Sequence, residues 1–358
     1  MTTSSPLRDP GGGSLGGRVV DVHAHAVPAA LLAELERGGR GERSGRGPEL
    51  PVLTDDRRVR FGARLTPPVA DALTDVRTRI AEMDRTGVDV QVVSPWLELS
   101  PDELAPDAAT GFLNALDEAM AAVVAMRPDR LLALSLLDRH DPVSAAVRLR
   151  HAAARPGFAG GELAAGGPGP RLDDERWDPL WKAAADTGAL ILLHPWRAAS
   201  PAGLRADRLG DIVDNPAQST AVVAAMVLAG VFDRFPSLRL CVVHGGGFLP
   251  YQAGRLDAIA RLRADWTDDR VPPSTALRRL YYDSLTHSAT SLAWLVDFAG
   301  SDHVLLGSDY PFPTGDPDAV AAVAAAPGLS GAQREDVLGG AAAGLLGRRA
   351  LTVPNRMK

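Results

Sequence analysis

Cysteine is almost absent from this chain, and neither positive charge nor long apolar runs are prominent. Cys241 is the one cysteine in 358 residues, so no disulfide forms within the chain and no cysteine cluster holds a structural metal. The net charge of -6 offers no basic face for nucleic acid or an anionic membrane. The apolar runs are shorter than the ~18 residues of a membrane span, and the N-terminus lacks a basic segment followed by an apolar one. We therefore expect a cytoplasmic protein with no nucleic-acid or membrane partner.

The first seventeen residues contain little that could enter a core. They are small, polar and glycine-rich and end in GGGSLGG, which predicts a disordered leader over 1–17. With 46% hydrophobic residues, the chain can bury a full core. No boundary separates the strands and helices that follow, so we expect 18–350 to form a single domain.

Eight short runs rich in aliphatic and β-branched residues divide the chain. Each has the length of a strand buried on both faces, and alanine-rich helical segments separate most of them. The predicted strands are 18–25, 88–95, 130–137, 157–163, 189–195, 238–246, 280–286 and 303–311. The predicted helices are 74–86, 107–126, 142–155, 174–187, 216–234, 249–264 and 288–299. Eight such units with right-handed crossovers predict an α/β protein, a (β/α)8 TIM barrel.

The first connection is much longer than an ordinary βα loop. Residues 26–87 separate the first two predicted strands, and only 74–86 has the pattern of a helix. We expect a lid-like insertion over 26–75, which includes the glycine- and arginine-rich RGGRGERSGRGPEL. The alternative is a solvated excursion with no role.

Histidines and one aspartate stand at the ends of four predicted strands. His23 and His25 lie two residues apart, so their side chains point to the same face and can chelate one ion. His194 closes the fifth strand, His244 the sixth and Asp309 the eighth. The carboxyl ends of the strands form the active-site mouth of such a barrel. The alternative, histidines that only pack in the core, leaves four buried imidazoles in need of partners.

Three imidazoles and one carboxylate form a borderline-to-hard set of metal ligands. Zinc is favoured, and manganese, iron and cobalt also suit such a set. Such a metal keeps one position open for water and lowers the pKa of that water toward neutrality. We therefore expect one divalent ion per subunit, in an enzyme that activates water.

Five motifs together resemble the amidohydrolase superfamily, and in particular its decarboxylase branch, typified by aminocarboxymuconate semialdehyde decarboxylase. They are D-x-H-x-H at 21–25, EMDRTGVDVQV at 82–92, HPW at 194–196, HGGG at 244–247 and LLGSDYPFP at 305–313. The resemblance covers most of the chain and implies a role for each residue of the strand ends. The implied metal ligands are His23, His25, His194 and Asp309. The implied acid/base is His244, with Asp309 as a second candidate for proton delivery.

Two further carboxylates are expected near the site. Asp283, at the end of the seventh strand, is placed to orient a ligand or catalytic histidine, or else to serve as a turn residue. Glu162 lies on the fourth strand and could also contact the site. That strand has no lysine, so a lysine carbamate bridging two metals is not expected.

Arginine is the side chain expected to hold an anionic substrate, because a guanidinium binds a carboxylate through two hydrogen bonds. The resemblance implies that Arg255 reaches the substrate carboxylate of a neighbouring subunit, and hence a homodimer. The alternative is an exposed arginine on the helix after the sixth strand. The resemblance also implies an arginine from the insertion, with Arg64 as the candidate and Arg58 and Arg60 as alternatives.

The segment after HPW departs from the resembling family, since RAASPAGLRADRLGDIVDNPAQST replaces a segment rich in lysine and aromatic residues. Trp196 is expected either to contact the substrate beside the metal or to pack in the core. His303 begins the eighth strand, at the opposite face of the barrel, and is expected to be structural or exposed.

Decarboxylation is the leading prediction for function. The substrate is expected to be an aromatic or unsaturated carboxylic acid, muconate-semialdehyde-like or hydroxybenzoate-like, and the reaction to be nonoxidative, with metal-bound water and His244 as acid/base. The alternative is a metal-dependent hydrolase of a lactone, amide or ring. A noncatalytic binding barrel is expected to lose His244 or a ligand, and neither is lost.

Overall fold

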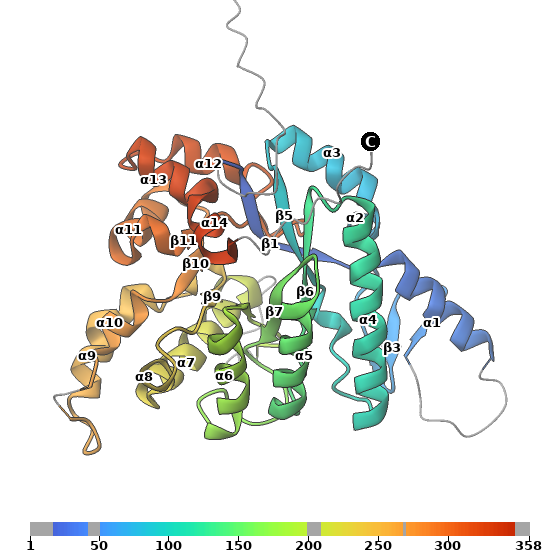
Figure 1. Cartoon of the computed structure of the whole chain (residues 1–358), viewed down its shortest axis with the longest axis horizontal. Helices are drawn as coiled ribbons and strands as arrows, with labels where there is room; N and C mark the ends of the chain where they lie inside the picture. The colour runs from blue at the N-terminus through green and yellow to red at the C-terminus, as the bar shows by residue number, and fades with distance from the viewer. Residues whose placement is uncertain (1–16, 42–50, 199–208, 268–269, 348–358) are drawn as a thin grey trace, which may run out of the picture.

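An eight-stranded parallel sheet forms the centre of the molecule, and helices surround it (Figure 1). The computed structural model describes residues 17–41, 51–198, 209–267 and 270–347. In sheet order, the strands are β1 (Val20–Ala26), β5 (Val90–Pro95), β6 (Leu131–Leu136), β7 (Phe158–Ala164), β8 (Leu190–His194), β9 (Leu240–Val242), β10 (Tyr281–Asp283) and β11 (Val304–Leu305). Each predicted strand overlaps one of these.

Hydrogen bonds from β1 to the segment that follows β11 join the two edges of this sheet and nearly close it. The amide of Val22 donates to the carbonyl of Leu306 at 2.9 Å, and the amide of His25 donates to the carbonyl of Tyr310 at 2.7 Å. Ala24 also forms a parallel bridge with Tyr310. The predicted (β/α)8 barrel is therefore confirmed.

The strands that precede the HGGG and LLGSDYPFP motifs end earlier than predicted. β9 ends at Val242 because His244 and the three glycines after it have positive φ angles, from 57° to 79°, which a strand does not accommodate. β11 ends at Leu305, and Asp309 also has a positive φ of 58°. Both motifs therefore lie in turns that follow the strands.

Twelve helices among the described residues follow or accompany these strands. They are α3 (Val76–Thr86), α4 (Pro106–Met126), α5 (Pro142–Ala154), α6 (Asp178–Thr187), α7 (Asn215–Leu228), α8 (Val231–Arg234), α9 (Ala253–Ala260), α10 (Pro273–Leu277), α11 (Ala289–Ala299), α12 (Ala319–Ala325), α13 (Gly331–Glu335) and α14 (Ala341–Leu346). The single helix predicted over 216–234 is wrong, because Gly230 adopts a left-handed conformation with φ 73° and separates α7 from α8. The helix predicted over 249–264 is shorter, with α9 following a 3-10 turn.

The insertion after β1 has a structure of its own. It contains α1 (Ala29–Gly41), a small antiparallel sheet of β2 (Val52–Leu53), β3 (Val59–Phe61) and β4 (Arg64–Leu65), and α2 (Asp71–Thr74). The sequence did not predict α1 or this sheet. The predicted leader lies outside the described residues except for Gly17.

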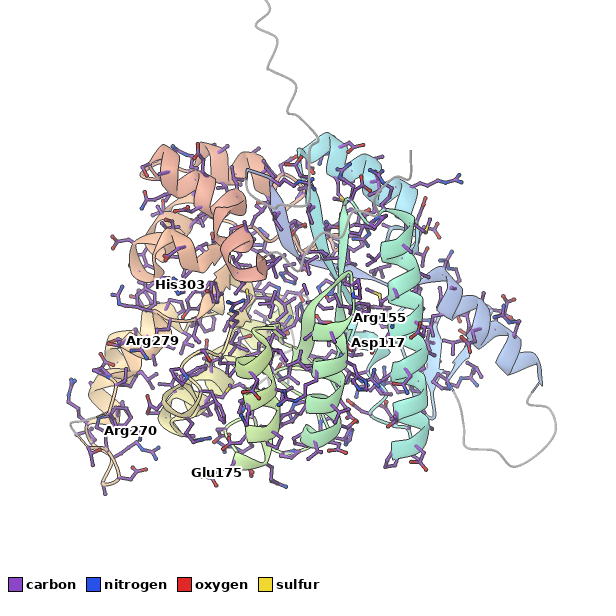
Figure 2. The ribbon with its side chains drawn as sticks, viewed as in Figure 1. Asp117, Arg155, Glu175, Arg270, Arg279 and His303 are labelled. Carbon is purple, nitrogen blue, oxygen red and sulfur yellow. The ribbon has the colours of Figure 1, made fainter. Side chains whose placement is uncertain are left out.

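Charged pairs join two of the outer helices. Arg148 of α5 donates to Asp117 of α4, and Arg155 donates to both carboxylate oxygens of Glu118 at 2.8 Å. Figure 2 shows Asp117 and Arg155 between these two helices. By length and composition, α4 is the one helix among the described residues that could cross a membrane, but it packs on β6 and α1.

Residues two apart on the strands share a face and fill the barrel. Leu190 and Leu192 of β8, with their counterparts on neighbouring strands, join an apolar cluster that α14 covers through Leu345 and Leu346. His194 follows Leu190 and Leu192 at the same spacing. Its side chain is therefore directed to the inside of the barrel at the carboxyl end of the strands.

Candidate metal centre

His23 and His25 lie on β1 and approach each other through their Nε2 atoms, 3.2 Å apart. The Nδ1 atom of His23 lies 2.7 Å from Oδ2 of Asp283, and a carboxylate only accepts, so His23 donates there and keeps the Nε2 lone pair for a ligand. The Nδ1 atom of His25 lies 3.0 Å from the hydroxyl of Ser94. Both imidazoles are completely buried.

His194 is held in the same way from the end of β8. Its Nδ1 atom donates to the carbonyl of Pro195 at 2.6 Å, and its buried Nε2 atom has no hydrogen-bond partner. Burial, together with the nearby His25 and His244, holds the pKa of His194 well below its usual value. A neutral imidazole with a free lone pair is the form that binds a metal.

Asp283 links two parts of the site. Besides accepting from His23, it accepts from the amide of Gly245 through Oδ1 at 2.7 Å. It therefore orients both His23 and the turn that carries His244. Asp283 ends β10, and it makes both a contact with a histidine and a contact with the following turn, the two alternatives that the sequence left open.

Asp309 is carried by the turn after β11, and Asp21 holds this turn against β1. Asp21 is completely buried and accepts from the hydroxyl of Ser308 at 2.6 Å and from the amide of His23 at 3.1 Å. Burial would raise the pKa of Asp309, but His23, His244 and His25 hold it well below its ordinary value. Asp21 begins the first motif, but no role was predicted for it.

The side chains brought together here fit a divalent metal. One ligand atom from each of four residues lies within 4.8 Å of the other three, and these residues are His23, His194, His244 and Asp309. Nε2 of His25 adjoins the group, 3.1 Å from Oδ1 of Asp309. That Oδ1 atom and Nε2 of His194 are buried without hydrogen-bond partners. Orphaned acceptors of this kind, in a set of imidazoles and a carboxylate, are what zinc or manganese would satisfy.

His25 and His244 differ in what they can reach. The side chain of His244 is 21% exposed and lines the cleft above the site, with Nε2 at 3.9 Å from Oδ2 of Asp309. His25 is buried and does not line the cleft. Glu162 lies behind His25, 3.7 Å from its Nδ1 atom, and burial raises the pKa of Glu162 to about 7.

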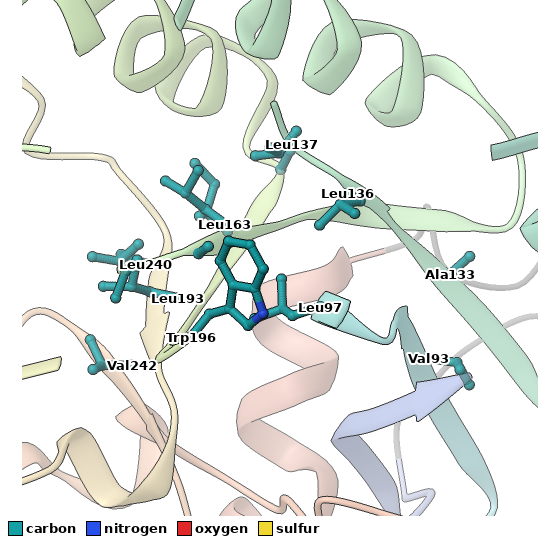
Figure 3. Close-up of a cluster of buried hydrophobic side chains, with 14 of the residues drawn as sticks. Val93, Leu97, Ala133, Leu136, Leu137, Leu163, Leu193, Trp196, Leu240 and Val242 are labelled. Atoms are coloured by element: carbon teal, nitrogen blue, oxygen red, sulfur yellow. The ribbon is translucent and has the colours of Figure 1, made fainter. Parts of the chain in front are cut away.

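A cleft of about 1240 Å³ opens over the candidate centre. His194, His244 and Asp309 lie on it, and Trp96, Trp196, Trp294 and Phe312 give it aromatic walls. Trp196 packs in the core, being only 5% exposed, and also lines the cleft. Figure 3 shows its indole among Leu97, Leu163 and Leu193.

The predicted arginines do not line this cleft. Arg64 lies on β4 and donates to the carbonyls of Glu98 and Ser100 and to the carboxylate of Glu103. Its guanidinium lies 6.0 Å from the ring centroid of Trp196. Arg255 is exposed on α9.

Two cleft residues were given little or no weight by the sequence analysis. Arg197 and His287 both line the cleft and both have positive φ angles, 49° and 51°. Arg197 directly follows the HPW motif, so its position after a strand end was the available signal. By contrast, His303 stacks on Tyr281, with ring centroids 4.9 Å apart, away from the centre (Figure 2).

Comparison with known proteins gives consistent matches. The sequence profile of the amidohydrolase family matches residues 20–348. The chain is 30% identical over 275 residues to a 2-amino-3-carboxymuconate-6-semialdehyde decarboxylase of Dictyostelium discoideum, covering 76% of this chain and 77% of that protein. It is 29% identical over 265 residues to a gamma-resorcylate decarboxylase of Rhizobium radiobacter, covering 67% of this chain and 78% of that one.

A solved structure has the same fold. The 5-carboxyvanillate decarboxylase of Novosphingobium aromaticivorans, in complex with manganese and 4-hydroxy-3-methoxy-5-nitrobenzoic acid, superposes with a TM-score of 0.73 at 21% identity and covers 94% of this chain and 97% of that one. The family match covers nearly the whole barrel and all five residues of the candidate centre. The chain therefore belongs to the amidohydrolase family.

Proposed function

We propose that this protein is a metal-dependent nonoxidative decarboxylase of an aromatic or unsaturated carboxylic acid. One observation carries the proposal: a group of imidazoles and a carboxylate that fits a metal lies at the base of a cleft of about 1240 Å³ with aromatic walls. The relatives named above are decarboxylases of such acids, which supports the assignment. Trp96 and Phe312, with ring centroids 6.3 Å apart, offer flat surfaces to a planar substrate.

We assign His23, His25, His194 and Asp309 as metal ligands. Zinc and manganese both suit this set, and manganese is present in the related 5-carboxyvanillate decarboxylase. When bound, the ion supplies a Lewis acid that neutralises negative charge on the substrate. His25 belongs with the ligands rather than the acid/base, because it is buried beneath the cleft.

His244 is assigned as the acid/base. It lines the cleft, and burial lowers its pKa while Asp309 and Asp283 raise it, with a net increase above the usual histidine value. A protonated imidazole at this position can deliver a proton to the carbon that loses carbon dioxide. Asp309, held ionised, balances that charge 3.9 Å away.

The test is a screen of muconate semialdehydes and hydroxybenzoates with the metal-loaded protein, following substrate loss and carbon dioxide release. Decarboxylation of at least one acid is expected, and hydrolysis of esters or lactones without carbon dioxide release would overturn the proposal. His244→Ala should retain the metal and lose at least about a hundredfold in kcat, the scale of general acid–base catalysis. Full turnover in this variant would remove His244 from the mechanism.

A homodimer in the cytoplasm is proposed for the working form. Exposed apolar side chains surround the outer cleft, including Tyr251 at 79% and Trp294 at 43% exposure, with ring centroids 6.2 Å apart. A patch of this kind suits burial against a second copy, which would bring Arg255 of α9 near the shared border. Mixing Arg255→Ala chains with His23→Ala chains should restore part of the activity, whereas sedimentation as a monomer would exclude the arrangement.

A further inference from the structure

The cleft over the metal centre contains one permanent cation in the part of the chain that the structure describes. Arg197 is the single arginine or lysine among the described lining residues, whereas Glu98, Asp211 and Asp309 are acidic. A carboxylic acid that enters this cleft therefore meets one guanidinium before or beside the metal. Carboxylates bind a guanidinium through two parallel hydrogen bonds.

The guanidinium of Arg197 is already held in place on two sides. Its Cζ atom lies 4.6 Å from the centroid of the Trp196 ring, and both its NH1 and NH2 atoms lie 3.3 Å from the same oxygen of Glu103. The other oxygen of Glu103 accepts from Nε of Arg64 at 2.8 Å. Two long hydrogen bonds to a single oxygen cannot satisfy five N–H donors, so these contacts orient Arg197 and leave it able to bind a ligand.

The backbone also indicates a constrained position. Five non-glycine residues in the described ranges have positive φ angles, and four of them line the cleft. These four are Arg197, His244, His287 and Asp309. Left-handed backbone is unfavourable for residues other than glycine, and such outliers gather where the surrounding structure imposes a functional geometry.

The other candidate arginines are occupied or distant. The side chain of Arg64 is 8% exposed and donates to two backbone carbonyls as well as to Glu103. Its contacts make it a support for Glu103 and, through Glu103, for Arg197. Arg255 does not line the cleft of its own chain.

We propose that Arg197 binds the carboxylate of the substrate at the mouth of the cleft, and that Glu103 is the positioning residue that aims its guanidinium. This inference rests on the proposed function, in which the substrate is a planar carboxylic acid. It places the group that recognises the acid on the loop directly after the ligand His194. The substrate is thereby held within the same chain as the metal, whatever a second copy adds.

Binding without turnover tests the proposal. The metal-loaded protein is titrated in a calorimeter with 2-hydroxybenzoate and, as an uncharged analogue, with 2-hydroxybenzamide. Arg197→Gln should weaken binding of the acid by about 10- to 100-fold, the worth of a charge-assisted bidentate contact, and change binding of the amide by less than about twofold. Arg197→Lys should recover part of the loss. The control is Arg171→Gln, which removes an exposed arginine that pairs with Asp173 and does not line the cleft.

Several outcomes would overturn the inference. Unchanged affinity for the acid in Arg197→Gln, or an equal loss of affinity for the acid and the amide, would show that this guanidinium does not bind the carboxylate. Glu103→Gln should weaken the binding of 2-hydroxybenzoate by about three- to tenfold. Tighter binding would show that Glu103 competes with the ligand for Arg197 instead of positioning it. Arg197-dependent binding in a protein that releases no carbon dioxide would overturn the proposed function alone. Decarboxylation with an unchanged KM in Arg197→Gln would overturn this inference alone.

Discussion

The bottom and the rim of the cleft are held in place by different means. The bottom consists of His23, His25, His194, Asp283 and Asp309, which lie on strands or the turns directly after them. Most of these side chains are buried, and each contacts another of the five or a backbone carbonyl next to them. The rim consists of Arg197, Tyr251, His287 and Trp294, which are exposed and lie on loops or outer helices.

This difference separates metal binding and turnover, at the bottom, from substrate binding, at the rim. The bottom has one arrangement, because each buried polar group depends on its neighbours for a partner. The rim is free to change, because an exposed side chain is lost at little cost in stability. We therefore expect changes at the bottom to affect metal and turnover, and changes at the rim to affect substrate binding alone.

The largest effect is expected for His25→Ala. Loss of one imidazole from the assigned ligand set should lower the metal-to-protein ratio by more than about tenfold and abolish measurable turnover. Elemental analysis of purified protein measures the ratio. His151→Ala on α5 is the matched control, since that histidine is exposed. A full complement of metal in His25→Ala would remove His25 from the ligand set.

Asp283→Asn should have the next largest effect. The asparagine keeps the size of the side chain but weakens the hydrogen bond from His23, so metal affinity should fall by about 10- to 100-fold. Competition with a chelator measures this affinity. The control is Asp297→Asn on the exposed face of α11. Unchanged affinity would show that Asp283 serves only the turn at Gly245.

Gly246→Ala should destabilise the fold near the bottom of the cleft. An added Cβ would lie 2.6 Å from two ring carbons of Tyr282, and the φ of 79° is unfavourable for alanine. Together, these effects should lower the free energy of unfolding by about 2–4 kcal/mol, measured by denaturant titration. Gly254→Ala meets open space on α9 and should be neutral or slightly stabilising. Equal stability of both variants would contradict the packing described for the HGGG turn.

His287→Gln should have the smallest effect. This exposed residue at the rim is expected to change KM by about two- to fivefold while metal content and kcat remain near their original values, because its contacts with substrate are shared with solvent. Steady-state kinetics separate the two parameters. A hundredfold loss in kcat would place His287 among the catalytic groups and remove the distinction between bottom and rim.

The sequence predicted the bottom of the cleft far better than its rim. His23, His25 and His194 lie on strands whose periodicity is local, so their common end of the barrel followed from the fold. Asp309 and His244 were assigned to strands but lie in turns, because their positive φ angles depend on packing that periodicity does not report. Arg197 was missed for the same reason: its role depends on Trp196 and Glu103, which lie on different elements.

The insertion was the least predictable part of the fold. The glycines in AALLAELERGGRG dilute the helical pattern of α1, and strands β2, β3 and β4 are two or three residues long, too short for an alternating pattern. The contact of Arg64 with Glu103 spans 39 residues and depends on the insertion folding back over the barrel. Long-range contacts of this kind cannot be predicted from the pattern of any one segment.

Asp283 ties the position of an assigned metal ligand to the position of the assigned acid/base. Its Oδ2 atom fixes an assigned ligand, and its Oδ1 atom fixes the backbone beside the acid/base. A lineage that adapts this barrel to a new reaction cannot drift at that position without disturbing both at once. We therefore expect new activities to evolve first through substitutions at the rim, while His23 and the turn of His244, both held by Asp283, are retained.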